Sequence, residues 1–268
     1  MNAAAPFTLC QGSQPLLVSL PHCGTELPAA FAARLMPKAR CLDDTDWHLA
    51  RLYAFAPDLG ASLLVPRYSR YLIDLNRPPD DACLYPGANT TGLCPQRSFC
   101  GDAIYLPGQA PDAAEIDERR RQYWHPYHDA LRSELARLKQ RHGHALLLDG
   151  HSIRSRLPWL FEGRLPDLNL GTADGASCAP PLRAALCAWL ASQRGYTQVV
   201  DGRFKGGYIT RAYGRPAERV HAVQLEMCWS CYMDEVGPFN LDPLRADRLG
   251  AVLRSLVQEL LAWRPADA

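Results

Sequence analysis

Two histidines in this sequence each follow a short apolar segment. His22 closes the stretch PLLVSLPH, which begins at Pro15, and His151 follows the run ALLL at 145–148. Apolar runs of this length that end at Pro or Gly predict buried strands of a parallel sheet. Because ligands of open α/β sheets bind beyond the carboxyl ends of the strands, the two imidazoles are expected to meet there and hold a metal ion. The alternative for each is a hydrogen bond within its own turn.

A carboxylate is the expected third ligand, and the sequence offers several. The acidic cluster DDTD at 43–46 precedes an apolar-periodic segment, where acids and Thr also serve as helix caps. Glu26, four residues after His22, is another candidate. Two histidines, one carboxylate and a water make up a catalytic zinc site, although cobalt, manganese or iron would also suit these ligands.

Further polar residues at strand ends predict the chemistry around such an ion. Glu226 lies in the apolar run 222–227, so burial should raise its pKa and suit it to act as general base and then acid. Guanidinium and amide groups at strand ends suit the capture of a substrate carboxylate. The candidates are Arg70, Asn76, Arg77, Arg203 and Arg211. The implied reaction is hydrolysis of an amide in a small acidic molecule.

Two other motifs are weighed against this site. GRFKGG at 202–207 lacks the Walker Lys-Ser/Thr and opens no G-x-G-x-x-G helix, so it predicts contact with an anionic substrate rather than a nucleotide. His125 and His128 are spaced i, i+3 on a predicted amphipathic helix, where packing is favoured over metal ligation.

Strands and helices alternate along the chain. Strands are expected at 16–20, 61–66, 71–73, 145–148, 196–200 and 222–227, and helices at 28–35, 47–56, 111–141, 181–194 and 244–263. This alternation predicts an α/β fold: a single domain, residues 1–268, with a mixed, mostly parallel central sheet flanked by helices. Residues 84–111 are too long and irregular for a simple connection and predict a functional loop. The polar stretch 152–180 also reads as a loop.

The composition excludes several classes of function. The 268 residues carry a net charge of +1, which gives no general attraction to nucleic acid or to an anionic membrane. No apolar run approaches about 20 residues and no secretory signal is visible, so a cytoplasmic location is expected. The expected partner is a small anionic substrate; the oligomeric state is not predicted.

Ten cysteines without regular spacing are expected to be mostly reduced. Cys228 and Cys231 form a C-x-x-C without a second pair, which leaves a redox role as an alternative.

Long motifs occur in order along almost the whole chain. They are SLPHCGTELP, DDTDWHLARLY, SRYLIDLNRPPD, LYPGANTTGLCP, YWHPYH, DGHSIRS, LFEGRLPDLNLGTADGASC, GRFKGGYITRAYGRP and VQLEM. In these motifs the chain resembles the N-formylglutamate amidohydrolase family, which is further similar to zinc carboxypeptidases and aspartoacylase. The resemblance implies a zinc-carboxypeptidase-like fold and Zn²⁺-dependent hydrolysis of N-formyl-L-glutamate to formate and L-glutamate. This reaction is the last step of a histidine degradation route.

The resemblance also implies roles for single residues. The stretch 74–77, DLNR, looks like the aspartoacylase element that holds a substrate carboxylate, and Glu226 looks like the carboxypeptidase glutamate that activates water. Carboxypeptidases take two ligands from His-x-x-Glu, but Thr25 stands in the glutamate position here. Asp46 occupies a similar topological place, and we therefore favour it over Asp44 and Glu26 as the third ligand.

Three other functions remain as alternatives. The first is a related amidohydrolase or carboxypeptidase-like enzyme acting on another N-acyl acidic amino acid. The second is a thiol redox or zinc-storage protein, and the third is a glutamate-binding module without turnover. A substrate panel, alkylation of the thiols and a turnover assay with added metal would distinguish them.

Overall fold

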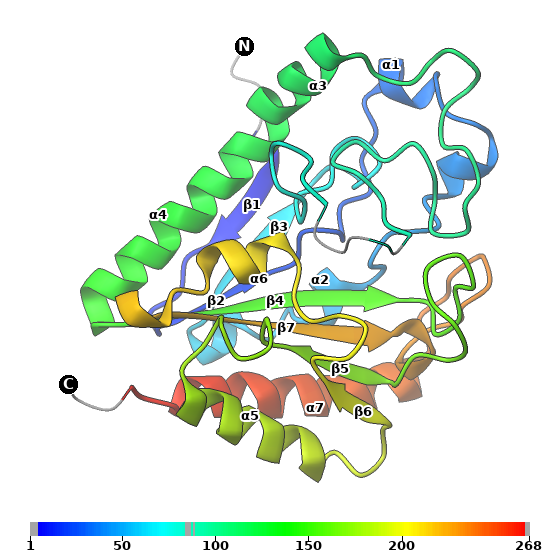
Figure 1. Ribbon diagram of the computed structural model, residues 1–268. Helices are drawn as coiled ribbons and strands as arrows, with labels where there is room; N and C mark the ends of the chain where they lie inside the picture. The colour runs from blue at the N-terminus through cyan, green and yellow to red at the C-terminus, as the bar shows by residue number, and fades with distance from the viewer. Residues whose placement is uncertain (1–4, 84–86, 88, 266–268) are drawn as a thin grey trace.

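The computed structural model describes residues 5–83, 87 and 89–265, and its centre is one continuous sheet of seven strands in the order β1-β3-β2-β4-β7-β5-β6 (Figure 1). The strands are β1 (Phe7–Cys10), β2 (Leu16–Ser19), β3 (Ser62–Pro66), β4 (Ala145–Ile153), β5 (Leu168–Gly171), β6 (Gln198–Val200) and β7 (Val220–Cys228). Four neighbouring pairs are parallel, whereas β1 with β3 and β5 with β7 are antiparallel. The predicted mixed, mostly parallel sheet is confirmed.

Helices cover both faces of this sheet (Figure 1). They are α1 (Ala29–Ala32), α2 (Leu49–Leu52), α3 (Ala113–Arg119), α4 (His125–His142), α5 (Pro180–Ser192), α6 (Tyr208–Tyr213) and α7 (Pro243–Ala262). Alternate strand residues face opposite layers. Leu17 and Leu147 pack with Leu131 of α4, while Leu148 packs with Leu253 of α7. In the described part of the chain, no helix combines the length and apolar character needed to cross a membrane.

The long helix predicted at 111–141 is present, but it is interrupted. A π-helical turn, Arg120–Trp124, separates α3 from α4, and Pro126 follows at the second position of α4. Proline has no amide hydrogen and disturbs the regular helical bonding of the preceding turn. Gly143, at φ 76°, ends the helix in the left-handed conformation.

Several local predictions were wrong. The run 71–73 forms a turn and not a strand: Tyr71 and Leu72 are buried against the cluster around Phe31, and three apolar residues cannot distinguish a strand from a buried loop. The helix expected at 47–56 is reduced to α2, and a 3₁₀ turn, Pro57–Leu59, follows the predicted range. β1, α6 and β5, which lies inside the stretch expected to be a loop, were not predicted.

The cysteines are thiols. All ten are free, and both Cys228 and Cys231 are buried. Burial raises the pKa of each of these two thiols, which makes them poor thiolates and gives a redox role no support.

Candidate metal and active site

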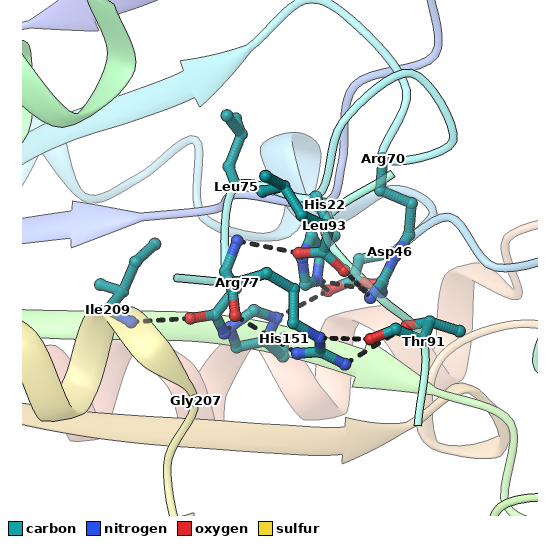
Figure 2. Close-up of polar contacts among 12 residues, drawn as sticks. His22, Asp46, Arg70, Leu75, Arg77, Thr91, Leu93, His151, Gly207 and Ile209 are labelled. Atoms are coloured by element: carbon teal, nitrogen blue, oxygen red, sulfur yellow. Dashed lines mark hydrogen bonds and ion pairs between the residues drawn. The ribbon is translucent and has the colours of Figure 1, made fainter. Parts of the chain in front are cut away.

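His22, Asp46 and His151 converge at the carboxyl edge of the sheet (Figure 2). Their candidate ligand atoms all lie within 4.8 Å of one another, and all three residues are buried. The Asp46 Oδ2 atom is 3.2 Å from His151 Nδ1 and 3.8 Å from His22 Nδ1. Because β2 and β4 are parallel neighbours, His22 beyond one strand and His151 on the other reach the same edge. The Asp46 amide donates to the His22 carbonyl at 3.0 Å, which fixes the carboxylate beside both rings.

The far nitrogen of each ring is held by a second carboxylate. His22 Nε2 donates to Asp74 Oδ1 at 2.7 Å, and His151 Nε2 lies 3.1 Å from Asp149 Oδ2. Histidines that bind metals usually donate their other ring N–H to a carboxylate, which fixes the tautomer and the ring orientation. Both Nδ1 atoms are thereby directed to the side of Asp46. This is the arrangement that a metal ion requires.

The charge of the site also fits a cation. The carboxylates of Asp46, Asp74, Asp149 and Glu226 are all buried, and among the described residues Arg70 is the one Lys or Arg that forms ion pairs with any of them. One oxygen of Asp149 is buried without a hydrogen-bond partner. Buried charges without compensation are costly, so a divalent ion would stabilise this arrangement. Two imidazoles and a carboxylate suit zinc or another first-row transition metal.

The histidines respond to this environment in opposite directions. Burial and then the charge of Arg70 lower the pKa of His22. Burial also acts to lower the pKa of His151, but Asp149 and Asp46 outweigh it and raise that pKa well above its usual value. Without a metal ion, a protonated His151 supplies positive charge to the site. A bound ion would supply this charge in its place, because a ligating histidine must be neutral. Arg70 NH1 lies 3.0 Å from His22 Nδ1, so an ion would compete with this guanidinium for that nitrogen.

Glu226 lies beside the metal-ligand cluster on β7. It is the ladder partner of His151 on the neighbouring strand and is 6 % exposed. Burial raises its pKa to about 8, and the charge of Asp46 adds to the effect while His151 opposes it. A carboxyl group with a raised pKa in a cavity suits general acid–base catalysis.

These groups line one cavity of about 610 Å³, including its open mouth. Its lining includes His22, Asp46, Arg70, Asn76, Arg77, Asn89, Thr90, Thr91, Phe99, His151, Arg203, Gln224 and Glu226. The loop predicted to be functional at 84–111 thus supplies part of the wall, although its residues 84–86 and 88 lie outside the described residues. The structure places eight of the nine predicted site residues around the cavity.

The three arginines of the cavity have different environments. Arg70 pairs with Asp74 at 2.6 Å and its guanidinium lies 4.5 Å from the centre of the Phe99 ring. Arg77 donates to the Thr91 carbonyl at 2.8 Å, and Figure 2 shows its guanidinium directed at Thr91. Arg203 has its Nε 3.4 Å from the Leu160 carbonyl.

Two predicted substrate ligands take other contacts. Asn76 lines the cavity, but its Oδ1 accepts from the Ile209 amide at 2.8 Å and its Nδ2 donates to Asp149 Oδ2 at 3.4 Å. It therefore holds neighbouring groups in place. Arg211 does not line the cavity; its Nε donates to the Gly206 carbonyl at 2.9 Å, so the structure gives its predicted role no support.

The alternative ligands are placed elsewhere. Glu26 is half-exposed and forms an ion pair with Arg67 at 2.9 Å. Asp44 is buried and accepts from the Phe99 amide at 2.8 Å, and burial raises its pKa to about 6. His128 stacks on Trp124, as expected for a packing residue.

Sequence reasoning missed the residues behind the ligands. Asp149 precedes His151 by two positions on one strand, which places both side chains on one face, and this spacing was a usable signal. Asp74 was considered only as part of an element for binding substrate, and nothing in the sequence connected it to His22. Gln224 precedes Glu226 by the same spacing on β7.

The protein has a mostly parallel α/β sheet, and two histidines, a carboxylate and a buried glutamate lie at the carboxyl edge of its strands. This set of donor groups is typical of a metallohydrolase. Comparison with known proteins identifies the group. The N-formylglutamate amidohydrolase profile matches residues 14–233, and the chain belongs to this family.

Similar proteins match the chain over nearly its full length. The chain is 54 % identical to the N-formylglutamate deformylase of Pseudomonas aeruginosa, over 94 % of this chain and 95 % of that protein. It is 52 % identical to the N-formylglutamate deformylase of Pseudomonas putida, over 94 % of both. The crystal structure of an N-formylglutamate amidohydrolase from Ralstonia eutropha JMP134 is similar with a TM-score of 0.82 at 30 % identity, over 96 % of this chain and 97 % of that one.

Proposed function

We propose that this protein hydrolyses N-formyl-L-glutamate to formate and L-glutamate, as the last step of a histidine degradation route. The family membership and the names of the two curated relatives support the substrate. The observation that carries the proposal is the joint placement of His22, Asp46, His151 and Glu226 in a cavity that also contains arginines. We further infer that residues 1–268 form one domain of this family. A cytoplasmic location stays a prediction from the sequence.

His22, Asp46 and His151 would hold the metal ion, with zinc as the favoured identity. When bound, such an ion acts as a Lewis acid toward the formyl carbonyl and makes water more acidic. Asp74 and Asp149 keep the two imidazoles in the required orientation.

Glu226 moves the proton in this proposal. Its carboxylate removes a proton from the attacking water, and the resulting carboxylic acid gives that proton to the nitrogen of the leaving glutamate. The raised pKa of Glu226 supports this role, because the group must both accept and return a proton near neutral pH. The guanidinium of Arg70, beside His22, would stabilise the negative charge that develops on the formyl oxygen.

Arg77 and Arg203 would bind the two carboxylates of the substrate. Both line the cavity, where Arg77 Nε donates to the Thr91 carbonyl and Arg203 NH2 donates to the Leu160 carbonyl. The wall of the cavity therefore carries positive charges that complement a dicarboxylate, as expected for a small anionic substrate.

The test is formate release from N-formyl-L-glutamate, with N-acetyl-L-glutamate and a glutamyl peptide as competitors. The wild-type protein should prefer the formyl compound, and Glu226→Gln should lower kcat by about 10²–10⁴-fold. Glu162→Gln, at an exposed position, is the matched control and should retain activity. Preference for another acyl group would contradict the proposed substrate, and an active Glu226→Gln would contradict the role of Glu226.

A further inference from the structure

Glu226 needs a defined orientation to serve the cavity. A glutamate side chain has three rotatable bonds, and general-base catalysis depends on the position of its carboxylate relative to the water. Among the described residues, the one hydrogen bond to this carboxylate comes from Gln224, whose Nε2 lies 3.4 Å from Glu226 Oε2. The two side chains lie on one face of β7, because residues two apart in a strand point the same way.

The direction of the Gln224 amide is fixed by a second contact. The backbone N–H of Gly207 donates to Gln224 Oε1 at 2.8 Å. Because a backbone N–H requires an oxygen acceptor, the amide cannot be reversed, and its NH₂ group must face Glu226. Gln224 is 3 % exposed, so water cannot easily replace either partner.

Gly207 lies in close contact with the side chain of Asn76. A Cβ atom at this position would lie 2.4 Å from Asn76 Nδ2, so only glycine allows this close approach. Asn76 in turn accepts from the Ile209 amide at 2.8 Å, at the start of α6 (Figure 2). The chain of contacts therefore runs from Asn76 through Gly207 and Gln224 to Glu226.

We propose that Gln224 is a positioning residue that holds the carboxylate of Glu226 toward the metal ligands by anchoring it to the Gly207 backbone. This inference rests on the proposed function, since it concerns the residue that moves the proton. Binding of substrate involves other groups of the cavity, so loss of Gln224 should affect turnover more than substrate affinity.

The sharpest variant is Gln224→Glu. It keeps the shape and the oxygen that accepts from Gly207, but it replaces the NH₂ donor facing Glu226 by a second carboxylate oxygen. We expect kcat for formate release to fall by about 10- to 100-fold, the scale of a misplaced catalytic group, with KM within about twofold of wild type. The second buried carboxylate should also lower the midpoint of thermal unfolding by several degrees, because a buried charge without compensation is costly. Gln198→Glu, the same exchange on the edge strand β6, is the control and should keep the wild-type kcat.

The outcomes separate the two proposals. A wild-type protein that releases no formate would refute the proposed function itself. Formate release by wild type that Gln224→Glu retains in full would refute only the role of Gln224. If Gln224→Glu does not fold, the uncharged and nearly isosteric Gln224→Met decides the matter in the same assay. A folded Gln224→Met with wild-type kcat overturns the inference, and one with a reduced kcat and an unchanged KM supports it.

Discussion

Replacing Asp149 by Asn should weaken metal binding without changing the shape of the site. Asp149 is fully buried, its Oδ2 lies 3.1 Å from His151 Nε2, and its other hydrogen-bond contacts, from Thr210 and Asn76, are 3.3 and 3.4 Å long. An amide oxygen can still accept from the ring N–H, but the negative charge is lost. The substitution therefore tests the negative charge of Asp149 next to the metal ligand His151, separately from the shape of the side chain.

The size of the effect follows from two independent estimates. Hydrogen bonds to charged groups contribute about 1.5–3 kcal/mol and those between neutral groups about 0.5–1.5, so the exchange removes about 1–1.5 kcal/mol. Loss of a carboxylate behind a ligating histidine generally lowers metal affinity by about 10- to 100-fold, which corresponds to about 1.4–2.8 kcal/mol. The two ranges overlap at the lower end of the second one, which corresponds to about tenfold. We therefore expect the zinc affinity to fall by about tenfold.

Competition with a chromophoric chelator measures this affinity. Asp201→Asn is the matched control, because it removes the charge of an aspartate that bonds to Thr172 and Arg183 away from the cavity. In the metal-free protein, the Asp149→Asn exchange should also lower the pKa of His151, since Asp149 is among the groups that raise it. Unchanged zinc affinity, or an equal loss in Asp201→Asn, would refute the role given to Asp149.

Two further predictions concern binding and stability. Arg203→Ala should raise KM for N-formyl-L-glutamate by at least about tenfold, because it removes a charged hydrogen bond to the substrate. Lys205→Ala removes an exposed partner of Asp174 and should leave KM unchanged in the same kinetic assay. Equal effects of the two substitutions would contradict the proposed contact between Arg203 and the substrate. Burial lowers the pKa of His128 to about 3, against about 6.5 when unfolded, so the unfolded chain binds a proton over this interval and the folded protein does not. His128 should therefore lower the free energy of unfolding by about 1.4 kcal/mol per pH unit as the pH falls from 6.5 toward 3. Urea unfolding at pH 6.5 and 5.0 measures this loss, which should be about 2 kcal/mol smaller in His128→Gln than in the wild type. An identical pH dependence in the variant would contradict the burial of a neutral imidazole.

The sequence allowed prediction of the strands that position the site, because their physical signal is strong. β2 and the first four residues of β4 are apolar on both faces, and this pattern placed His22 and His151 at one edge. The end expected after Leu148 was wrong, because β4 continues through His151 to Ile153. β5 was missed because Asn169 interrupts its short apolar run and its pairing is with a strand more than 50 residues away. Such a pairing depends on tertiary contacts that no local pattern records.

The same distinction applies to the site residues. Each metal ligand and Glu226 could be predicted because its chemistry is visible in its residue type and in its sequence context. His22 follows a buried strand, His151 and Glu226 belong to apolar segments, and Asp46 belongs to an acidic cluster. The pairings of Asp74 with His22, and of Gln224 with Gly207, join segments far apart in the chain and depend on interatomic distances. The role of Arg211 as a substrate ligand stays a prediction, since its Nε donates to the Gly206 carbonyl and residue type alone does not reveal such a contact.

The most direct test of the account combines metal analysis with the formate assay on the same purified protein. We expect about one transition-metal ion per chain, loss of N-formyl-L-glutamate hydrolysis after chelation, and recovery when zinc is returned. His151→Ala should lose both the ion and the activity. Full activity in metal-free protein, or a His151→Ala variant that keeps its metal content and its turnover, would contradict the account.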